Sequence, residues 1–346
     1  MDTDSKNDSE ASTLVALSLL SFTNTDKLKA LERVREEGSF AGLELLLSGR
    51  QREIGRRIYD ACCEGGIEVI TIVNPRYPNA LKQTDGAPLV LFIRSERPEA
   101  IIPDTVLGVV GTRAASVGVC QYASGLAAEL AFAGFTVVSG LALGIDGAAH
   151  RGALQAAIDC PTVAVLAHGL DMIYPSSHQA LARQILAAGG VLVSEYPPST
   201  EPLKHHFLAR NRIIAGLSRG VIIVQAGARS GSLVTAQFAA DFGRDVFIVS
   251  PDSSDDRFAG GGLMLEQGAL VISSAADVLA EYGVGRPASM SLETSEDISL
   301  TDAMCQFGLS YTELVEKELR GELVRLQGNR VRFTQGITRS SERWCK

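Results

Sequence analysis

The chain has 346 residues, enough for about two domains, and its 46% apolar and 21% charged residues are typical of a soluble globular protein. Lysine and arginine total 32 against 40 aspartate and glutamate residues, so the formal net charge of -8 excludes a general basic coat but not a local basic patch. No stretch approaches the roughly 18 consecutive apolar residues of a membrane span, and the acidic beginning is unlike a secretory signal, so we expect a cytoplasmic protein.

The first 74 residues predict a tail followed by a small helical module. Residues 1–10 carry four acids and one lysine among polar residues, which favours a disordered tail. In the module, residues 11–74, leucines at helical spacing over 13–62 predict helices, and a short strand is expected at 68–73. Prolines at 75, 78 and 88 then mark the start of the next domain.

Residues 75–280 predict one long α/β domain. Short runs rich in valine and isoleucine alternate with segments of helical length, which is typical of strands buried on both faces. This alternation predicts a doubly wound, mostly parallel sheet with helices on both faces. The expected strands are 106–110, 136–139, 162–166, 190–194, 221–224, 245–249 and 270–272, and the expected helices are 117–133, 147–158, 177–188 and 231–242.

The last part of the chain predicts a linker and a short module. Residues 281–298 hold four acids and one arginine among several serines and a proline, which indicates a linker. Two short helices at 299–306 and 310–320, then a hairpin of 323–326 with 330–333, make residues 299–335 similar to a winged-helix module. A tail of residues 336–346 follows. Because residues 1–10 and 281–302 together hold seven of the eight net negative charges, the rest of the chain is nearly neutral.

Three strand-to-helix turns predict an anion site. The carboxyl ends of parallel strands meet at one sheet edge, where ligands bind, and small residues there leave the N–H groups of the following helix open to phosphate. Arg113 and Arg229 add charge beside two of the turns. The candidate residues of the turns are Gly111, Thr112 and Arg113; Ser139, Gly140 and Gly144; and Arg229, Ser230, Gly231 and Ser232.

A second basic feature follows Glu201. From residue 202 to residue 240 there is no aspartate or glutamate, against five lysine and arginine residues. Phe207 and two histidines among these charges offer planar groups on which bases can stack. The candidate residues are Lys204, Phe207, Arg210, Asn211 and Arg212, and we expect the last three to open a helix that ends near Leu217.

The usual motifs of cofactor-dependent and metal-dependent enzymes are missing from the sequence. No Gly-Lys pair of a P-loop, no GxGxxG and no HExxH occurs, and the six cysteines form no CxxC pair. We therefore expect no cofactor, no metal and no enzymatic activity.

Taken in order, the motifs resemble those of the DprA (Smf) family of DNA-processing proteins of bacterial transformation. The resemblance covers residues 75–280. The residues that carry it are Tyr77-Pro78, Leu91-Phe92, Gly111-Thr112-Arg113, Ser139 to Asp146, Ala149 to Leu154, His168 to Asp171, Tyr174-Pro175, Ser194 to Pro198, Phe207, Arg210 to Ser218, and Arg229 to Thr235.

This resemblance implies an extended Rossmann-like domain that binds single-stranded DNA, protects incoming strands and helps to load RecA, acting as a homodimer. Arg113 is then expected to hold backbone phosphate beside Gly111 and Thr112. Lys204, Arg210 and Arg212 supply further charge, while Phe207 contacts a base and Asn211 forms a hydrogen bond.

Two other functions remain open. In a nucleotide phosphoribohydrolase of the LOG type, a glycine-rich turn precedes a catalytic glutamate; here the corresponding turn from Arg229 to Gln237 has no acid, and Glu195 is the only stand-in. In a pure interaction protein, the α/β domain serves only to dimerise. Single-strand binding measured against base release from AMP distinguishes these functions.

Overall fold

The computed structural model describes residues 2–20, 47–97, 102–228, 230–249, 259–284, 298–299, 323–326 and 330–333. The chain divides into a larger unit that ends at Gly283 and a smaller unit that begins at Val284. Among the described residues, no helix combines the length and the apolar character needed to cross a membrane.

A nine-stranded sheet organises the larger unit, in the order β1-β2-β6-β5-β4-β3-β7-β8-β9. Strands β3 to β9 pair in parallel, while β1 with β2 and β2 with β6 pair antiparallel. The predicted doubly wound, mostly parallel sheet is therefore confirmed. The strands are β1 (Glu68–Thr71), β2 (Val90–Arg94), β3 (Val106–Val110), β4 (Thr136–Ser139), β5 (Thr162–Leu166), β6 (Val191–Ser194), β7 (Gly220–Ile223), β8 (Asp245–Val249) and β9 (Leu270–Ile272).

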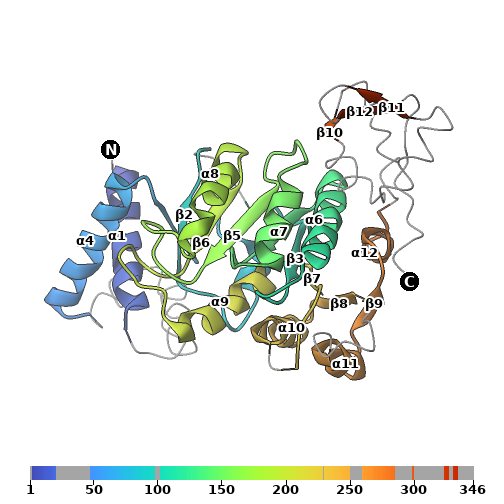
Figure 1. Ribbon diagram of the computed structural model, residues 1–346. Helices are drawn as coiled ribbons and strands as arrows, with labels where there is room; N and C mark the ends of the chain where they lie inside the picture. The colour runs from blue at the N-terminus through green and yellow to red at the C-terminus, as the bar shows by residue number, and fades with distance from the viewer. Residues whose placement is uncertain are drawn as a thin grey trace. The chain divides into compact units, whose positions relative to one another are not determined.

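Helices cover both faces of this sheet (Figure 1). Those that connect β3 to β6 pack on one another along one face, whereas α9 and α10 connect the chain through β7 to β8 and pack together along the other. The helices are α1 (Asp2–Ser18), α4 (Gly49–Glu64), α5 (Asn79–Lys82), α6 (Val117–Phe132), α7 (Ile145–Ala153), the 3-10 turn η1 (Ser176–His178), α8 (Gln179–Ala187), α9 (Lys204–Leu217), α10 (Gly231–Asp241), α11 (Ala259–Glu266) and α12 (Ala275–Glu281).

The central strands are buried because both of their faces carry helices. All five residues of β3 and of β5 are buried, as are all four of β4, β6 and β7. Valine and isoleucine dominate these strands, since branched side chains pack well on a pleated surface. The continuous apolar runs in the sequence follow directly from this two-sided burial.

The N-terminal segment differs from the predicted disordered tail. Helix α1 begins at Asp2, inside the segment expected to be a tail, and packs against α4. Leu14 and Val15 are fully buried and anchor the helix, and the Tyr59 hydroxyl donates a hydrogen bond of 2.6 Å to the carboxylate of Asp8. The helical pattern beyond residue 13 thus extends outward through the polar residues. Strand β1 after α4 is an edge strand of the large sheet.

The smaller unit contains a three-stranded antiparallel sheet in the order β10-β12-β11. Strands β11 (Leu323–Leu326) and β12 (Arg330–Phe333) form the predicted hairpin, and β10 (Ile298–Ser299) pairs with β12. Ser299, expected to begin a helix, is the last residue of β10 because its backbone pairs with Arg330. The rest of the two predicted helices lies outside the described residues.

Candidate nucleic-acid interface

The order in which the chain adds strands to the sheet reverses between β3 and β7. From β3 it proceeds through β4 and β5 to β6, and it then returns to form β7 on the other side of β3. The connections after these two neighbouring strands therefore diverge and leave a crevice at the carboxyl edge. A cavity of about 210 Å³ lies there, which we name the switch-point pocket. Its lining is Val110, Gly111, Thr112, Arg113, Ala142, Asp146, Phe207, Leu208, Arg210, Asn211, Ile214, Ser230, Gly231, Ser232 and Thr235.

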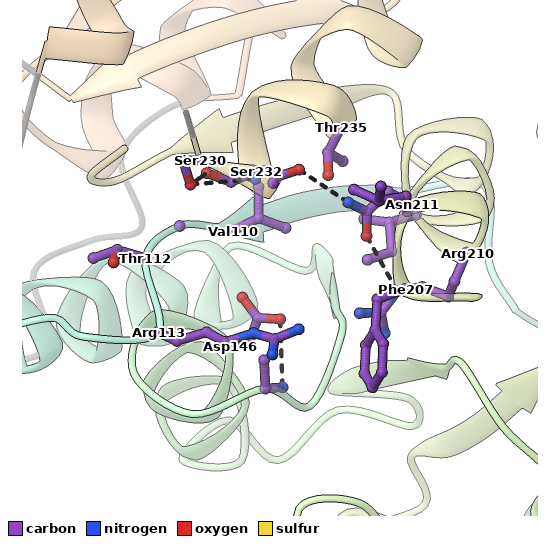
Figure 2. Close-up of a pocket in the computed structure, with 15 residues that line it drawn as sticks. Val110, Thr112, Arg113, Asp146, Phe207, Arg210, Asn211, Ser230, Ser232 and Thr235 are labelled. Carbon is purple, nitrogen blue, oxygen red and sulfur yellow. Dashed lines mark hydrogen bonds between the residues drawn. The ribbon is translucent and has the colours of Figure 1, made fainter. Parts of the chain in front are cut away.

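The turns predicted from the sequence meet at this pocket (Figure 2). Gly111, Thr112 and Arg113 line it after β3, and Ser230, Gly231 and Ser232 line it after β7. Ser139, Gly140 and Gly144 are not in the lining, although Ala142 and Asp146 from the same β4–α7 connection are. Arg229 lies outside the described residues.

Two glycines let the turns approach one another. A Cβ on Gly111 would lie 2.3 Å from Cδ1 of Ile145, and a Cβ on Gly144 would lie 2.5 Å from the carbonyl oxygen of Thr112. Gly144 also has a φ of 75° and is the N-cap of α7, a conformation that glycine adopts without strain. These glycines thus set the shape of the pocket through close packing.

The amino end of α10 closes one side of the pocket. Ser230 is its N-cap and accepts a hydrogen bond from the backbone N–H of Ser232 at 3.3 Å, and the two hydroxyls are 2.7 Å apart. No acidic residue stands in the first turn of this 11-residue helix, so its positive end is not neutralised from within. This end of the pocket is suited to an anion.

An aromatic and cationic group stands at the mouth of the pocket. The guanidinium of Arg113 lies 5.0 Å from the centroid of the Phe207 ring, within the range of a cation–π contact. The ring of Tyr174 is 5.8 Å from Phe207, and both Arg113 and Tyr174 are exposed. Tyr174 was not among the predicted site residues. The sequence gives no signal of a binding role for Tyr174, because its contact with Phe207 forms only when the loop after β5 packs beside α9.

Helix α9 begins earlier than predicted. It starts at Lys204 rather than at Arg210, so Arg210, Asn211 and Arg212 lie in its interior. Its N-cap, Leu203, gives no side-chain cap, which removes the usual sequence signal of a helix start. Lys204 is exposed in the first turn. His206 in the same turn stacks on Tyr196 with 4.1 Å between ring centroids.

Arg210 is buried, in contrast to its expected role as free positive charge. Only 3% of the residue is exposed, and its guanidinium donates hydrogen bonds to the carbonyls of Gly140, at 2.8 Å, and Val165. A Cβ on Gly140 would lie 2.5 Å from this guanidinium, so glycine is required there. Burial lowers the pKa of Arg210 to about 10, which leaves it charged at neutral pH. Arg210 therefore ties α9 to the loop after β4 and to strand β5.

Asn211 and Ser139 also have interior partners. Asn211 donates from Nδ2 to the carbonyl of Gly231 at 3.0 Å and accepts from Nε of Arg210 at 3.2 Å. The Ser139 hydroxyl is fully buried and donates to the carbonyl of Val109 at 2.7 Å. The polar atoms of these two residues thus position the turns that surround the pocket.

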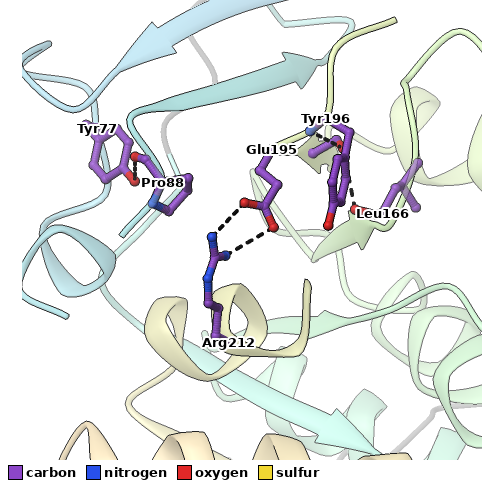
Figure 3. Close-up of polar contacts among 7 residues, drawn as sticks. Tyr77, Pro88, Leu166, Glu195, Tyr196 and Arg212 are labelled. Atoms are coloured by element: carbon purple, nitrogen blue, oxygen red, sulfur yellow. Dashed lines mark hydrogen bonds and ion pairs between the residues drawn. The ribbon is translucent and has the colours of Figure 1, made fainter. Parts of the chain in front are cut away.

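Arg212 is paired with Glu195 (Figure 3). Two guanidinium nitrogens donate to the two carboxylate oxygens at 3.1 and 2.6 Å, and the side chains are 14% and 15% exposed. Neither residue lines the pocket. The acid-free stretch of sequence around Arg212 therefore does not make it a free cation, because its acidic partner follows β6.

Replacing Glu195 with glutamine removes the charge that holds Arg212. We expect the free energy of unfolding to fall by about 1.5–3 kcal/mol, the usual contribution of hydrogen bonds to charged groups. Affinity for single-stranded DNA should stay within about threefold of wild type, because a substitution at a distant site usually changes the free energy of another by no more than about 0.5 kcal/mol. Urea titration and oligonucleotide binding measure the two effects. Loss of binding without loss of stability would show that Glu195 or Arg212 acts at the interface itself.

Asp146 is the acidic residue of the pocket lining. Its Oδ2 accepts hydrogen bonds from the backbone N–H groups of Gly140, at 3.1 Å, and Ala142, at 3.4 Å. Burial raises the pKa of this carboxyl, while the positive charge of Arg210, the two N–H groups and Arg113 oppose that rise. Asp146 lies inside α7 and not at its N-cap, which is Gly144. The sequence resemblance included Asp146 in a motif, but it was not among the predicted site residues.

Comparison with known proteins gives the family of the chain. The family described as DNA recombination-mediator protein A matches residues 68–283, a range that contains the whole described pocket. The chain belongs to this family. The resemblance to DprA (Smf) proteins seen in the sequence is thereby confirmed.

Named relatives of this family are similar to the chain over its central part. The chain is 42% identical to the DNA processing protein DprA of Bacillus subtilis over 226 residues, which is 65% of the chain and 74% of that protein. It is 40% identical to protein Smf of Escherichia coli over 209 residues, 60% of the chain and 55% of that protein. The matched region thus spans little more than half of the second relative.

Two solved structures of the family share the fold. DprA from Streptococcus pneumoniae is 34% identical, with a TM-score of 0.65, and the match covers 79% of this chain and 97% of that one. DprA from Helicobacter pylori is 30% identical, with a TM-score of 0.54, and the match covers 62% of this chain and 95% of that one. The Helicobacter pylori protein is described as having a unique single-stranded DNA binding mode.

Proposed function

We propose that the chain binds single-stranded DNA at the switch-point pocket and acts there as a DNA recombination mediator. The observation that carries the proposal is the pocket itself, where an exposed arginine, an aromatic ring and a free helix amino end meet at one sheet edge. The family membership and the single-strand binding described for the Helicobacter pylori relative support it.

The anionic backbone of DNA fits the cationic side of the pocket. Arg113 is exposed and forms no ion pair among the described residues, so its guanidinium is available to a phosphate. Gly111 and Thr112 stand beside it, and Ser230, Gly231 and Ser232 offer hydroxyl and N–H donors at the start of α10. Lys204 adds charge on the approach, and the proposal includes Arg229 as a further phosphate contact. Arg210, Asn211 and Arg212 contribute by holding α9 in position.

The bases of a single strand fit the apolar side of the same interface. Leu208 and Leu143 are 49% and 48% exposed, and Phe207 lies beside Tyr174. In a duplex, bases are stacked inside and only their edges are accessible, whereas a single strand presents their faces to aromatic side chains. Exposed apolar side chains around a cationic pocket therefore favour a single strand over a duplex.

Binding of a labelled oligonucleotide, followed by fluorescence anisotropy at several salt concentrations, tests the proposal. We expect tight binding to a single strand, weaker binding to the matching duplex and a linear fall of log affinity with log salt, because bound cations release counterions from the strand. Equal affinity for both forms, or no binding at low salt, would contradict the proposal.

Replacing Phe207 with leucine removes the aromatic face but keeps an apolar side chain. We expect affinity for a single strand to fall about fivefold or more, since stacking on an aromatic ring contributes about 1–3 kcal/mol per base. The salt dependence should not change, because no charge is lost. Phe132→Leu is a matched control, since that half-buried ring ends α6 at the opposite sheet edge. A loss of similar size in both variants would assign the effect to folding.

The wider role follows the family resemblance. We propose that the chain acts in the cytoplasm as a homodimer, without catalytic activity, protects incoming strands and loads RecA onto them. The same proposal divides the chain into a helical module, an α/β domain, a linker and a winged-helix-like module. Sedimentation tests the dimer, and RecA filament formation on strands coated with single-strand-binding protein tests the loading.

The phosphoribohydrolase alternative depends on an unpaired catalytic glutamate. Glu195 was its candidate, and both of its oxygens accept from Arg212. A carboxylate held this way is poorly placed to attack or polarise a nucleotide. Release of free base from AMP that is abolished by Glu195→Gln would restore the alternative.

A further inference from the structure

The switch-point pocket suits anions, yet it also contains the buried carboxylate of Asp146. Asp146 is 6% exposed and is the one acid among the fifteen described lining residues, beside Arg113 and the amino end of α10. A phosphate placed against it would meet like charge in surroundings that screen charge weakly. The part of the pocket beside Asp146 therefore suits a neutral group that donates hydrogen bonds.

The carboxylate is fixed in orientation and keeps one acceptor free. Oδ2 is held by the N–H groups of Gly140 and Ala142, and Figure 2 shows Asp146 among the residues that line the pocket. In the part of the chain that the structure describes, Oδ1 has no hydrogen-bond partner. Oδ1 is not one of the buried polar atoms without a partner, so the pocket leaves it accessible. An unpaired oxygen aimed at a cavity is thus a recognition feature for a donor.

The groups around Asp146 define which donor fits. Arg113 supplies donors from the same pocket, Phe207 supplies a stacking face beside it, and Ser230 and Ser232 supply hydroxyls opposite. The ligand that matches is planar, with donors on one edge and acceptors on another. A nucleobase has this form, and guanine alone among the DNA bases presents two adjacent donors, N1–H and N2–H, next to the acceptors O6 and N7.

We propose that Asp146 reads a guanine base in the bound strand, accepting hydrogen bonds from its N1–H and N2–H groups. This rests on the proposed function, since it assigns one base of a bound single strand to the pocket. Thymine fits less well because carbonyls flank its N3–H, and adenine and cytosine each present a single amino group on that edge. Asp146 is then a specificity-determining residue for single-strand binding.

The test compares short thymidine oligonucleotides that differ at one central position. That position carries guanine, hypoxanthine, adenine, cytosine or thymine, and binding is followed by fluorescence anisotropy. We expect guanine to bind about fivefold or more tightly than thymine, in line with the discrimination of a good bidentate base contact. Hypoxanthine, which lacks the N2 amino group, should fall between them.

Asp146→Asn isolates the free oxygen. An asparagine can still accept from Gly140 and Ala142 through its oxygen, while its NH2 group replaces the acceptor that faces the pocket. We expect the guanine preference to disappear and the affinity for the all-thymine strand to be kept or to rise. Glu201→Gln is the matched control, because it removes one exposed negative charge near α9 and outside the pocket lining, and it should keep the preference.

The outcomes separate this inference from the proposed function. If the all-thymine strand binds with no preference for guanine, or if the preference survives in Asp146→Asn, the assignment of Asp146 is wrong while single-strand binding stands. If none of the five oligonucleotides binds, the proposed function itself fails. Thermal unfolding of each variant shows that it is folded when binding is measured.

Discussion

Replacing Arg210 with alanine is expected to lower the free energy of unfolding by about 3–5 kcal/mol, the cost of removing one partner from a buried charged network. The change leaves the carbonyls of Gly140 and Val165 without a donor, and Asp146 without a nearby positive charge. Single-strand binding should be lost together with stability, since the loop after β4 and strand β5 lose their tie to α9. Chemical denaturation measures the first effect, because a change in midpoint at constant slope reports stability.

Arg210→Lys is the conservative variant for this test. It keeps the charge but offers one ammonium where a planar fork served several acceptors, so we expect it to recover part of the lost stability. Arg210 was expected from the sequence to supply charge for phosphate. A variant Arg210→Ala that unfolds at the wild-type midpoint and still fails to bind would restore that direct role and contradict the structural one.

Replacing Arg113 with alanine is expected to have the opposite profile. The side chain is exposed, contacts Phe207 through a cation–π interaction and forms no ion pair among the described residues, so stability should change by less than about 0.5 kcal/mol. Affinity for a single strand should fall about tenfold or more, because a hydrogen bond to a charged group contributes about 1.5–3 kcal/mol. The slope of log affinity against log salt should decrease by about 0.7, the value for one phosphate contact on a single strand.

Arg151→Ala provides the matched control for Arg113. It removes the same charge from an exposed residue in the last turn of α7, at the sheet edge opposite the pocket. It should leave both affinity and salt slope close to wild type. Equal losses in the two variants would show that net charge, rather than the pocket, drives binding.

The sheet and its turns were predictable because their signals are local. Strands such as Val106–Val110 and Thr162–Leu166 are continuous apolar runs, and burial on both faces requires such runs. Once the sheet is parallel, the turns after β3, β4 and β7 must meet at one edge. Gly111, Thr112, Arg113 and the residues from Ser230 to Ser232 were therefore found from the sequence without knowledge of any contact.

The roles of the basic residues in α9 were not predictable, because their partners are distant in the chain. Arg210 bonds to residues 70 and 45 positions away, and Arg212 pairs with Glu195 across the gap between β6 and α9. A count of charges along the sequence treats all of these arginines alike. In the folded protein Arg113 is exposed at the pocket, whereas Arg210 and Arg212 hold α9 in place.

The start of α9 and the fold of the N-terminal segment were missed for a different reason. Leu203 gives α9 no side-chain cap, and α1 extends through polar residues that show no apolar periodicity. In both places tertiary packing decides the boundary, since most helical stability in proteins comes from an apolar face packed on its neighbours.

Photo-crosslinking tests most directly whether the switch-point pocket binds DNA. A single strand that carries a photoreactive thiothymidine is bound to the full chain and irradiated, and the attached peptides are identified by mass spectrometry. We expect attachment to peptides that contain Phe207 or Tyr174, whose rings stand together at the pocket mouth. Attachment confined to residues 284–346, with none around the pocket, would contradict the account.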